Sequence, residues 1–126
     1  MTVFQVAVIA AFLGTGAGVA LTCSGCSDSV RSVHPTRAAA QPDIDRGWIP
    51  PVLPASATQI RERHDLDANV GHGTFAFAAS DAEQFRAALV PLAPTQPLRP
   101  QGVSRSEFER RGSSFYTHGD FDIAVN

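Results

Sequence analysis

The chain has 126 residues and carries ten arginines, no lysine and twelve acidic residues, so its formal net charge is −2. This balance excludes a polybasic nucleic-acid-binding protein, which needs a net positive face to neutralise phosphates, and we expect no nucleic-acid partner. A hydrophobic fraction of 44% excludes an acidic disordered tail. The length favours a single small domain.

The first 26 residues are expected to be a signal peptide or a membrane anchor. No charged side chain occurs in residues 2–27, and residues 3–22 are almost entirely apolar or small, Gln5 being the main exception. About 20 such residues in a helix span a hydrocarbon core of roughly 30 Å, and no polar face marks this segment as a soluble core helix. If the segment is retained, the protein is a single-pass membrane protein, and Arg31 and Arg37 favour a cytoplasmic C-terminal side.

The only two cysteines, Cys23 and Cys26, directly follow this apolar segment. Two ligands do not complete a zinc site, and nothing around the pair resembles a thioredoxin-like motif. A cysteine that follows an apolar leader and small residues resembles the lipidation site of bacterial lipoproteins. Cys26, after Ser24 and Gly25, fits this pattern better than Cys23. Lipidation of Cys26 predicts an exported protein on the periplasmic side of the cell envelope, held on the membrane by its acyl chains. Without lipidation, the pair is a small disulfide or two free thiols in a discarded leader.

Residues 27–41 show no periodicity and are expected to be a flexible tether, which leaves residues 42–126 for the domain. Residues 58–64 and 73–78 predict two strands of a β-hairpin. Ser80 and Glu83 have the spacing of a capping box, which predicts a helix that continues to Leu89 and ends at Pro91. The prolines of residues 91–100 predict a stiff connecting loop, or less readily a ligand for an aromatic groove.

A helical turn over residues 104–111 and a second hairpin over residues 113–125 complete the prediction. The predicted fold class is α+β: a small antiparallel sheet in the order ββαββ with one helix packed on a face, preceded by the apolar N-terminal helix. The predicted core consists of Trp48, Ile60, Phe75, Phe77, Phe85, Leu89, Phe115, Phe121, Ile123 and Val125.

Polar residues are concentrated in residues 61–72. Asp65, Asp67 and Asn69 match the first three alternating oxygen ligands of an EF-hand loop, but its sixth and twelfth positions are filled by unsuitable residues. His64 and His72, with Asp65 or Asp67, are candidate ligands of a transition metal across the hairpin. Asp and Asn are also ordinary turn residues, and we favour that interpretation, so no metal or other cofactor is expected. The sequence carries none of the common catalytic motifs, and no catalytic residue is assigned.

Three ordered segments stand out: Arg46-Gly47-Trp48-Ile49-Pro50, Leu53-Pro54-Ala55-Ser56-Ala57 and His64-Asp65-Leu66-Asp67-Ala68-Asn69. In this order they resemble a family of small exported bacterial lipoproteins of unknown function that is labelled the YbbD head domain. The resemblance covers roughly residues 46–90 and implies an envelope-associated lipoprotein, without a substrate or a catalytic residue.

We expect structural roles for the motif residues. Trp48 is expected to dock on the sheet, Ser56 to bond a strand end, and Arg46 to pair with an acid of the turn. The full set is Arg46, Gly47, Trp48, Pro50, Pro54, Ser56, Ala57, His64, Asp65, Asp67 and Asn69.

Two classes of function follow from these observations. The first is a non-catalytic accessory or protein-binding module of the cell envelope, attached to the membrane and contacting an envelope protein. The second is a small metal-dependent hydrolytic enzyme that uses His64, Asp65, Asp67 and His72.

Overall fold

The structure is a computed structural model that describes residues 3–11, 29–99 and 104–126. The chain is a mixture of helices and antiparallel strands, which confirms the predicted α+β class. The strands are β1 (Val3–Ala11), β2 (Ser29–Thr36), β3 (Thr58–Asp65), β4 (Val70–Ala78), β5 (Val90–Pro91), β6 (Ser114–His118) and β7 (Phe121–Val125). The helices are α1 (Gln41–Asp45), α2 (Ala82–Ala87) and α3 (Arg105–Arg110), with a 3-10 turn η1 (Ala79–Asp81) before α2.

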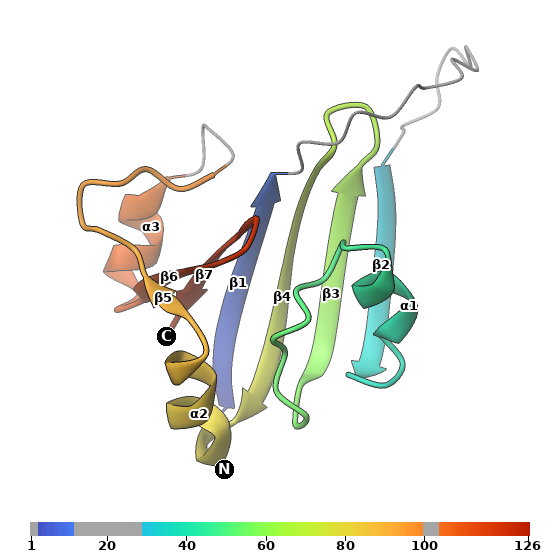
Figure 1. Cartoon of the computed structure of the whole chain (residues 1–126), viewed down its shortest axis with the longest axis horizontal. Helices are drawn as coiled ribbons and strands as arrows, with labels where there is room; N and C mark the ends of the chain where they lie inside the picture. The colour runs from blue at the N-terminus through green and yellow to red at the C-terminus, as the bar shows by residue number, and fades with distance from the viewer. Residues whose placement is uncertain (1–2, 12–28, 100–103) are drawn as a thin grey trace.

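The strands form one antiparallel sheet in the order β2-β3-β4-β1-β7-β6-β5. Strand β1 lies at its centre, where nine of its residues pair with β4 and five pair with β7. It therefore joins two three-stranded halves, β2-β3-β4 and β7-β6-β5 (Figure 1). Strands β1, β2 and β5 were not predicted from the sequence.

The N-terminal segment is described only in part. Residues 3–11 form strand β1, and most of the apolar helix expected over residues 3–22 lies outside the described residues. A nearly continuous apolar run rich in valine also suits a strand with neighbours on both edges. Residues 12–22, Cys23 and Cys26 lie outside the described residues, so the targeting and lipidation roles stay predictions. None of the helices in the described part of the chain has the length and hydrophobicity of a membrane span.

The predicted flexible tether, residues 27–41, is also corrected by the structure. Its residues 29–36 form β2, which pairs with β3 from Ser29 opposite Asp65 to Thr36 opposite Thr58. Along β2, half-buried and exposed residues largely alternate, which is typical of a strand with one covered face. The folded part of the chain therefore extends N-terminally beyond residue 42.

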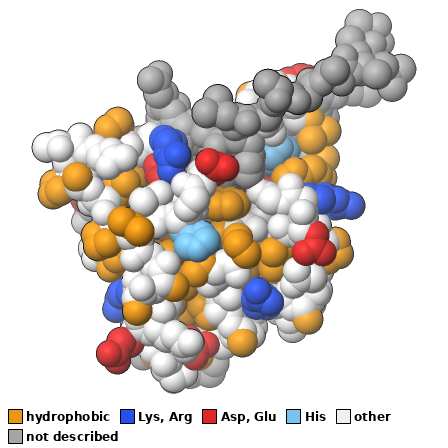
Figure 2. All heavy atoms as spheres, in the orientation of Figure 1, with side chains coloured by type: hydrophobic (Ala, Val, Ile, Leu, Met, Phe, Trp, Pro, Cys, Tyr) orange, Lys and Arg blue, Asp and Glu red, His pale blue; other side chains and the backbone are white. Residues whose placement is uncertain are grey.

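The main core lies on one face of the sheet, beneath α1, residues 46–57 and α2 (Figure 1). Eight of the ten predicted core residues belong to this cluster; Phe115 is buried in a second cluster, and Trp48 remains partly exposed. The sequence did not reveal Ala40, Ile44, Ile49, Leu53 and Ala57, which precede β3 and fold back over it. On this side of the molecule, the arginine side chains are scattered singly among apolar and neutral groups (Figure 2).

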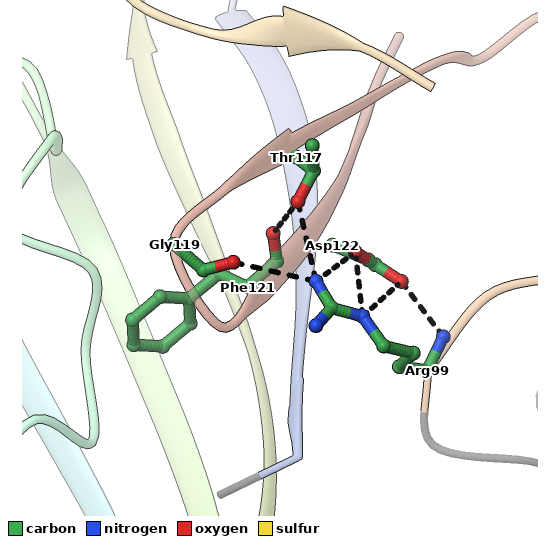
Figure 3. A network of polar contacts seen from close by, with 5 residues as sticks. All are labelled: Arg99, Thr117, Gly119, Phe121 and Asp122. Atoms are coloured by element: carbon green, nitrogen blue, oxygen red, sulfur yellow. Dashed lines mark hydrogen bonds and ion pairs between the residues drawn. The ribbon is translucent and has the colours of Figure 1, made fainter. Parts of the chain in front are cut away.

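The opposite face of the β7-β6-β5 half is covered by α3 and residues 92–99, with Leu92, Leu98, Phe115 and Ala124 buried between them. Arg99 fixes this cover to the hairpin (Figure 3). Its Nη2 donates to Asp122 Oδ1 at 2.8 Å and its backbone N–H to Asp122 Oδ2 at 2.8 Å. Asp122 is 1% exposed, and its hydrogen bond holds the pKa of Arg99 above its usual value. This network holds residues 92–99 in place.

Helix α2 begins differently from the prediction. Ser80 lies within η1, and α2 follows Asp81, at which no side-chain cap is formed. The predicted capping box of Ser80 and Glu83 is therefore wrong. The carboxylate of Asp81 instead accepts a hydrogen bond from Ser56 at 2.5 Å, which ties the start of α2 to residues 46–57.

Candidate functional site

The motif residues meet on the covered face of the β2-β3-β4 half. The ring of Trp48 stacks on His64 of β3, with centroids 4.7 Å apart and planes at 15°. The Arg46 guanidinium lies 5.2 Å from the Trp48 ring centroid. Gly47, between them, has φ +79°, a conformation that favours glycine and turns the chain from α1 onto the sheet. Trp48 thus docks on the sheet as predicted.

Asp43 of α1 is the anionic centre of this arrangement. Its side chain is 4% exposed, and its carboxylate contacts His34 Nε2 of β2 at 2.7 Å and Arg46 Nη1 at 2.8 Å. Burial raises the pKa of Asp43, but hydrogen bonds from His34, Ser32 and Arg46 outweigh it and hold the pKa below its usual value. Arg46 therefore pairs with an acid of α1 and not, as predicted, with an acid of the 65–71 turn. The result is a link between α1, β2 and the chain leading to Trp48.

Glu62 is a second buried carboxylate, next to His64 on the same face of β3. Its side chain is 3% exposed, and its Oε1 lies 3.6 Å from His64 Nδ1. Neither carboxylate oxygen of Glu62 has a hydrogen-bond partner in the described part of the chain. Burial, together with the negative charge of Asp43, raises its pKa to about 7. Glu62 is therefore half-protonated near neutral pH.

Two glycines of β4 make room for these side chains. Gly71 lies opposite His64 in the register and Gly73 lies opposite Glu62. A Cβ at Gly71 would come within 3.0 Å of His64 Nδ1, and one at Gly73 within 2.4 Å of the Arg61 carbonyl. The cavity beside them, between Trp48 and β4, has a volume of about 10 Å³, which is the space of about one water molecule. Glu62 and His64 therefore lie beneath Trp48 and residues 46–57, against the narrow space that the two glycines leave.

The 65–71 turn uses its acidic residues locally. Asp65 Oδ1 accepts hydrogen bonds at 3.0 Å from the backbone N–H groups of both Asp67 and Ala68. Asn69 has φ +50°, and its Oδ1 lies 3.3 Å from His64 Nε2. These contacts match the turn interpretation of the Asp and Asn residues.

The structure does not bring the four candidate metal ligands together. His64 points to the covered face, whereas His72 lies on the other face, opposite Arg63. Asp65 and Asp67 are exposed at the tip of the hairpin. Across residues 3–11, 29–99 and 104–126, no three His, Cys, Asp or Glu side chains are placed to hold a metal ion. No observation in this region favours the hydrolytic enzyme.

Ser56 bonds a strand end, as predicted. Its hydroxyl accepts a hydrogen bond from the N–H of Ala78, the last residue of β4, at 3.1 Å, and donates to Asp81. Nearby, Ala57 is 1% exposed and Pro50 is fully buried. Pro54 lines a hollow of about 260 Å³ between residues 52–55 and α2. Through these contacts, the C-terminal part of residues 46–57 is held on β4 and on the start of α2.

The sequence analysis missed the open face of the β2-β3-β4 half. Three exposed arginines lie there: Arg31 on β2, and Arg61 and Arg63 on β3. With His72 and Thr74 of β4 and Val33 of β2, they line a groove of about 220 Å³. The i, i+2 spacing of Arg61 and Arg63 in a predicted strand indicates a shared face, but Arg31 lies in the segment that we expected to be a tether.

The match to known families covers the half of the sheet just described. Residues 28–76 match the YbbD head domain. The matched segment of this head domain begins just before β2 and ends within β4, so it includes α1, Trp48 and both strands that carry the arginines. The resemblance expected over residues 46–90 is thus confirmed for this family, but its extent is shifted toward the N-terminus. Neither the curated proteins nor the solved structures contain a match to the chain.

Proposed function

We propose that this protein is a lipoprotein of the cell envelope and that its domain is a non-catalytic module that binds another envelope protein. The observation that carries the binding role is the open, arginine-lined face of β2-β3-β4. Arg46, Trp48, Ser56 and His64 make internal contacts on the other face, where they hold the fold together. The open face is the part of the head domain left for a partner.

Anchoring at the membrane is proposed from the sequence alone. An uncharged, largely apolar segment precedes Cys26, with small residues directly before that cysteine, and resemblance to the head-domain family implies an envelope lipoprotein. Acylation of Cys26 by two or more chains would hold the domain on the periplasmic side of the membrane.

Strand β1 favours a second form of the protein, in which the N-terminal segment is retained. Cleavage before Cys26 removes Val3–Ala11, and with it the strand that pairs with both β4 and β7. A membrane-spanning helix over residues 3–22 would also take these residues out of the sheet. The seven-stranded sheet and the processed lipoprotein are thus mutually exclusive states of this segment.

The intact mass of the mature protein distinguishes these forms. A processed lipoprotein has lost residues 1–25 and gained the mass of acyl chains on Cys26, whereas the seven-stranded form retains its N-terminus. For the lipoprotein, Cys26→Ser is expected to release the protein from the membrane fraction, while the control Cys23→Ser leaves fractionation unchanged. An unmodified, full-length mass, or membrane association unaffected by both substitutions, would refute lipidation.

A further inference from the structure

A row of basic side chains crosses the open face of the β2-β3-β4 half. In the strand register, Arg31 of β2 lies opposite Arg63 of β3, which in turn lies opposite His72 of β4. Directly opposite residues on one face have Cβ atoms about 5 Å apart. Arg61 lies two residues from Arg63 on the same strand and therefore points to the same side. All four side chains are exposed.

The arginines of this row have no ion-pair partner within the described residues. Among the described residues, Arg31, Arg61 and Arg63 form no ion pair, whereas Arg46, Arg99, Arg105 and Arg111 each do. The nearest acid along this face of β3 is Asp65, and its Oδ1 is bonded to the turn. Like charges placed directly opposite each other destabilise a sheet. An anion bound at the Arg31–Arg63 pair would therefore relieve this repulsion.

The shape of the groove limits what binds there. Its volume of about 220 Å³ is below the roughly 300–1,000 Å³ of pockets that enclose small-molecule ligands. Val33, which is 72% exposed, and Thr74 supply apolar surface beside the guanidinium groups. This combination suits side chains that project from an extended polypeptide.

We propose that this groove binds an extended acidic segment of a partner protein, an inference that rests on the binding function proposed above. Alternate residues of an extended chain lie about 6.7 Å apart on one side, and Arg61 and Arg63 have the same i, i+2 spacing along β3. Two carboxylates at positions i and i+2 of the partner then each face one guanidinium, and arginine forms paired hydrogen bonds with a carboxylate. Arg31 and His72 flank the carboxylate at Arg63.

Other anionic partners fit these observations less well. A nucleic acid draws its affinity from neutralising many phosphates, and this chain carries a net charge of −2. A membrane surface is bound through clusters of basic residues beside an inserted apolar face, whereas the arginines here surround a small groove with a single exposed valine.

The test measures binding of a fluorescein-labelled peptide with six alternating Glu-Thr units to the full chain by fluorescence anisotropy. The same peptide with Gln in place of Glu is the ligand control. Loss of one charge-assisted contact lowers affinity by about tenfold, so Arg63→Gln is expected to weaken binding to that extent. The matched control is Arg110→Gln, which removes an exposed arginine from α3 and is expected to change binding less than twofold.

Three outcomes overturn the acidic-peptide inference. They are absence of binding to the Glu peptide, equal binding of the Gln peptide, and equal loss of affinity in the Arg63 and Arg110 variants. Binding to phosphatidylglycerol vesicles is measured as well. If the protein binds these vesicles but not the peptide, and Arg63→Gln abolishes vesicle binding, then the groove contacts a membrane and the acidic-peptide inference is wrong.

Photo-crosslinking in cells separates this inference from the proposed function. A photoreactive residue at Val33 is expected to crosslink to a protein, and the adduct is expected to disappear when Arg31 and Arg63 are both replaced by Gln. An adduct that persists in the double variant, without peptide binding, leaves the binding function standing and refutes the acidic partner. Peptide binding without any protein adduct at Val33 refutes the binding function and, with it, this inference.

Discussion

Replacing the buried Glu62 with glutamine is expected to change how the stability of the protein depends on pH. Burial and the nearby charge of Asp43 raise the pKa of Glu62 from 4.5 to about 7 in the folded protein. Because the folded state binds this proton more tightly than the unfolded chain, the free energy of unfolding falls as pH rises between these values. A shift of this size corresponds to a loss of about 3 kcal/mol. Glu62→Gln has no such proton to lose.

The assay is urea-induced unfolding followed by the fluorescence of Trp48, the only tryptophan, at pH values from 5 to 8. The free energy of unfolding of the wild type is expected to fall by about 2.5 kcal/mol relative to Glu62→Gln across this range, because part of the full loss occurs below pH 5. His34, Asp43 and His64, the titratable groups that surround Glu62, are retained in both proteins. Glu83→Gln, an exposed position in α2, is the control. Parallel pH profiles for wild type and Glu62→Gln would show that Glu62 is ionised in the folded state without cost, which refutes the argument.

Five further substitutions test other parts of the structure by the same unfolding assay. Asp43→Asn is expected to lower the free energy of unfolding by about 2 kcal/mol at pH 7. Because the pKa of Asp43 is lowered in the folded protein, this loss must shrink as pH falls below about 4. A loss that stays constant with pH contradicts the lowered pKa. Gly73→Ala places a Cβ 2.4 Å from a backbone carbonyl of β3 and is expected to cost at least about 2 kcal/mol. Gly112→Ala is the control: a Cβ at this position meets no atom within 4 Å, but the backbone has φ +77°. It should lower the free energy of unfolding by only about 1 kcal/mol. Arg99→Gln leaves the buried carboxylate of Asp122 without its cationic partner, so it should lower the free energy of unfolding by about 3 kcal/mol. Asp122→Asn removes the buried charge itself and should therefore lower it less. The reverse order contradicts the cost assigned to an unpaired buried carboxylate.

Several local elements were predictable because their signals are short-range. The alternation in residues 73–78 predicted β4, residues 58–64 before a turn-rich segment predicted β3, and residues 104–111 predicted α3. The turn at 118–120 predicted the second hairpin, where Gly119 adopts φ +57°. Each of these signals is contained within a few neighbouring residues, and the structure confirms them.

The resemblance to the head-domain family singled out residues such as Trp48, His64 and Asn69, and the turn character of Asp65 and Asn69 was predictable because Asp and Asn bond their own backbone, as Asp65 does here. Only the tertiary structure decided their partners. Arg46 forms its ion pair with Asp43 and not with an acid of the 65–71 turn. Glu62 is buried next to His64, although no sequence pattern distinguished it from a surface acid. Burial and strand register depend on contacts between segments far apart in the chain. For that reason, the basic row formed by Arg31, Arg63 and His72 on three different strands was visible only once β2 had been placed beside β3.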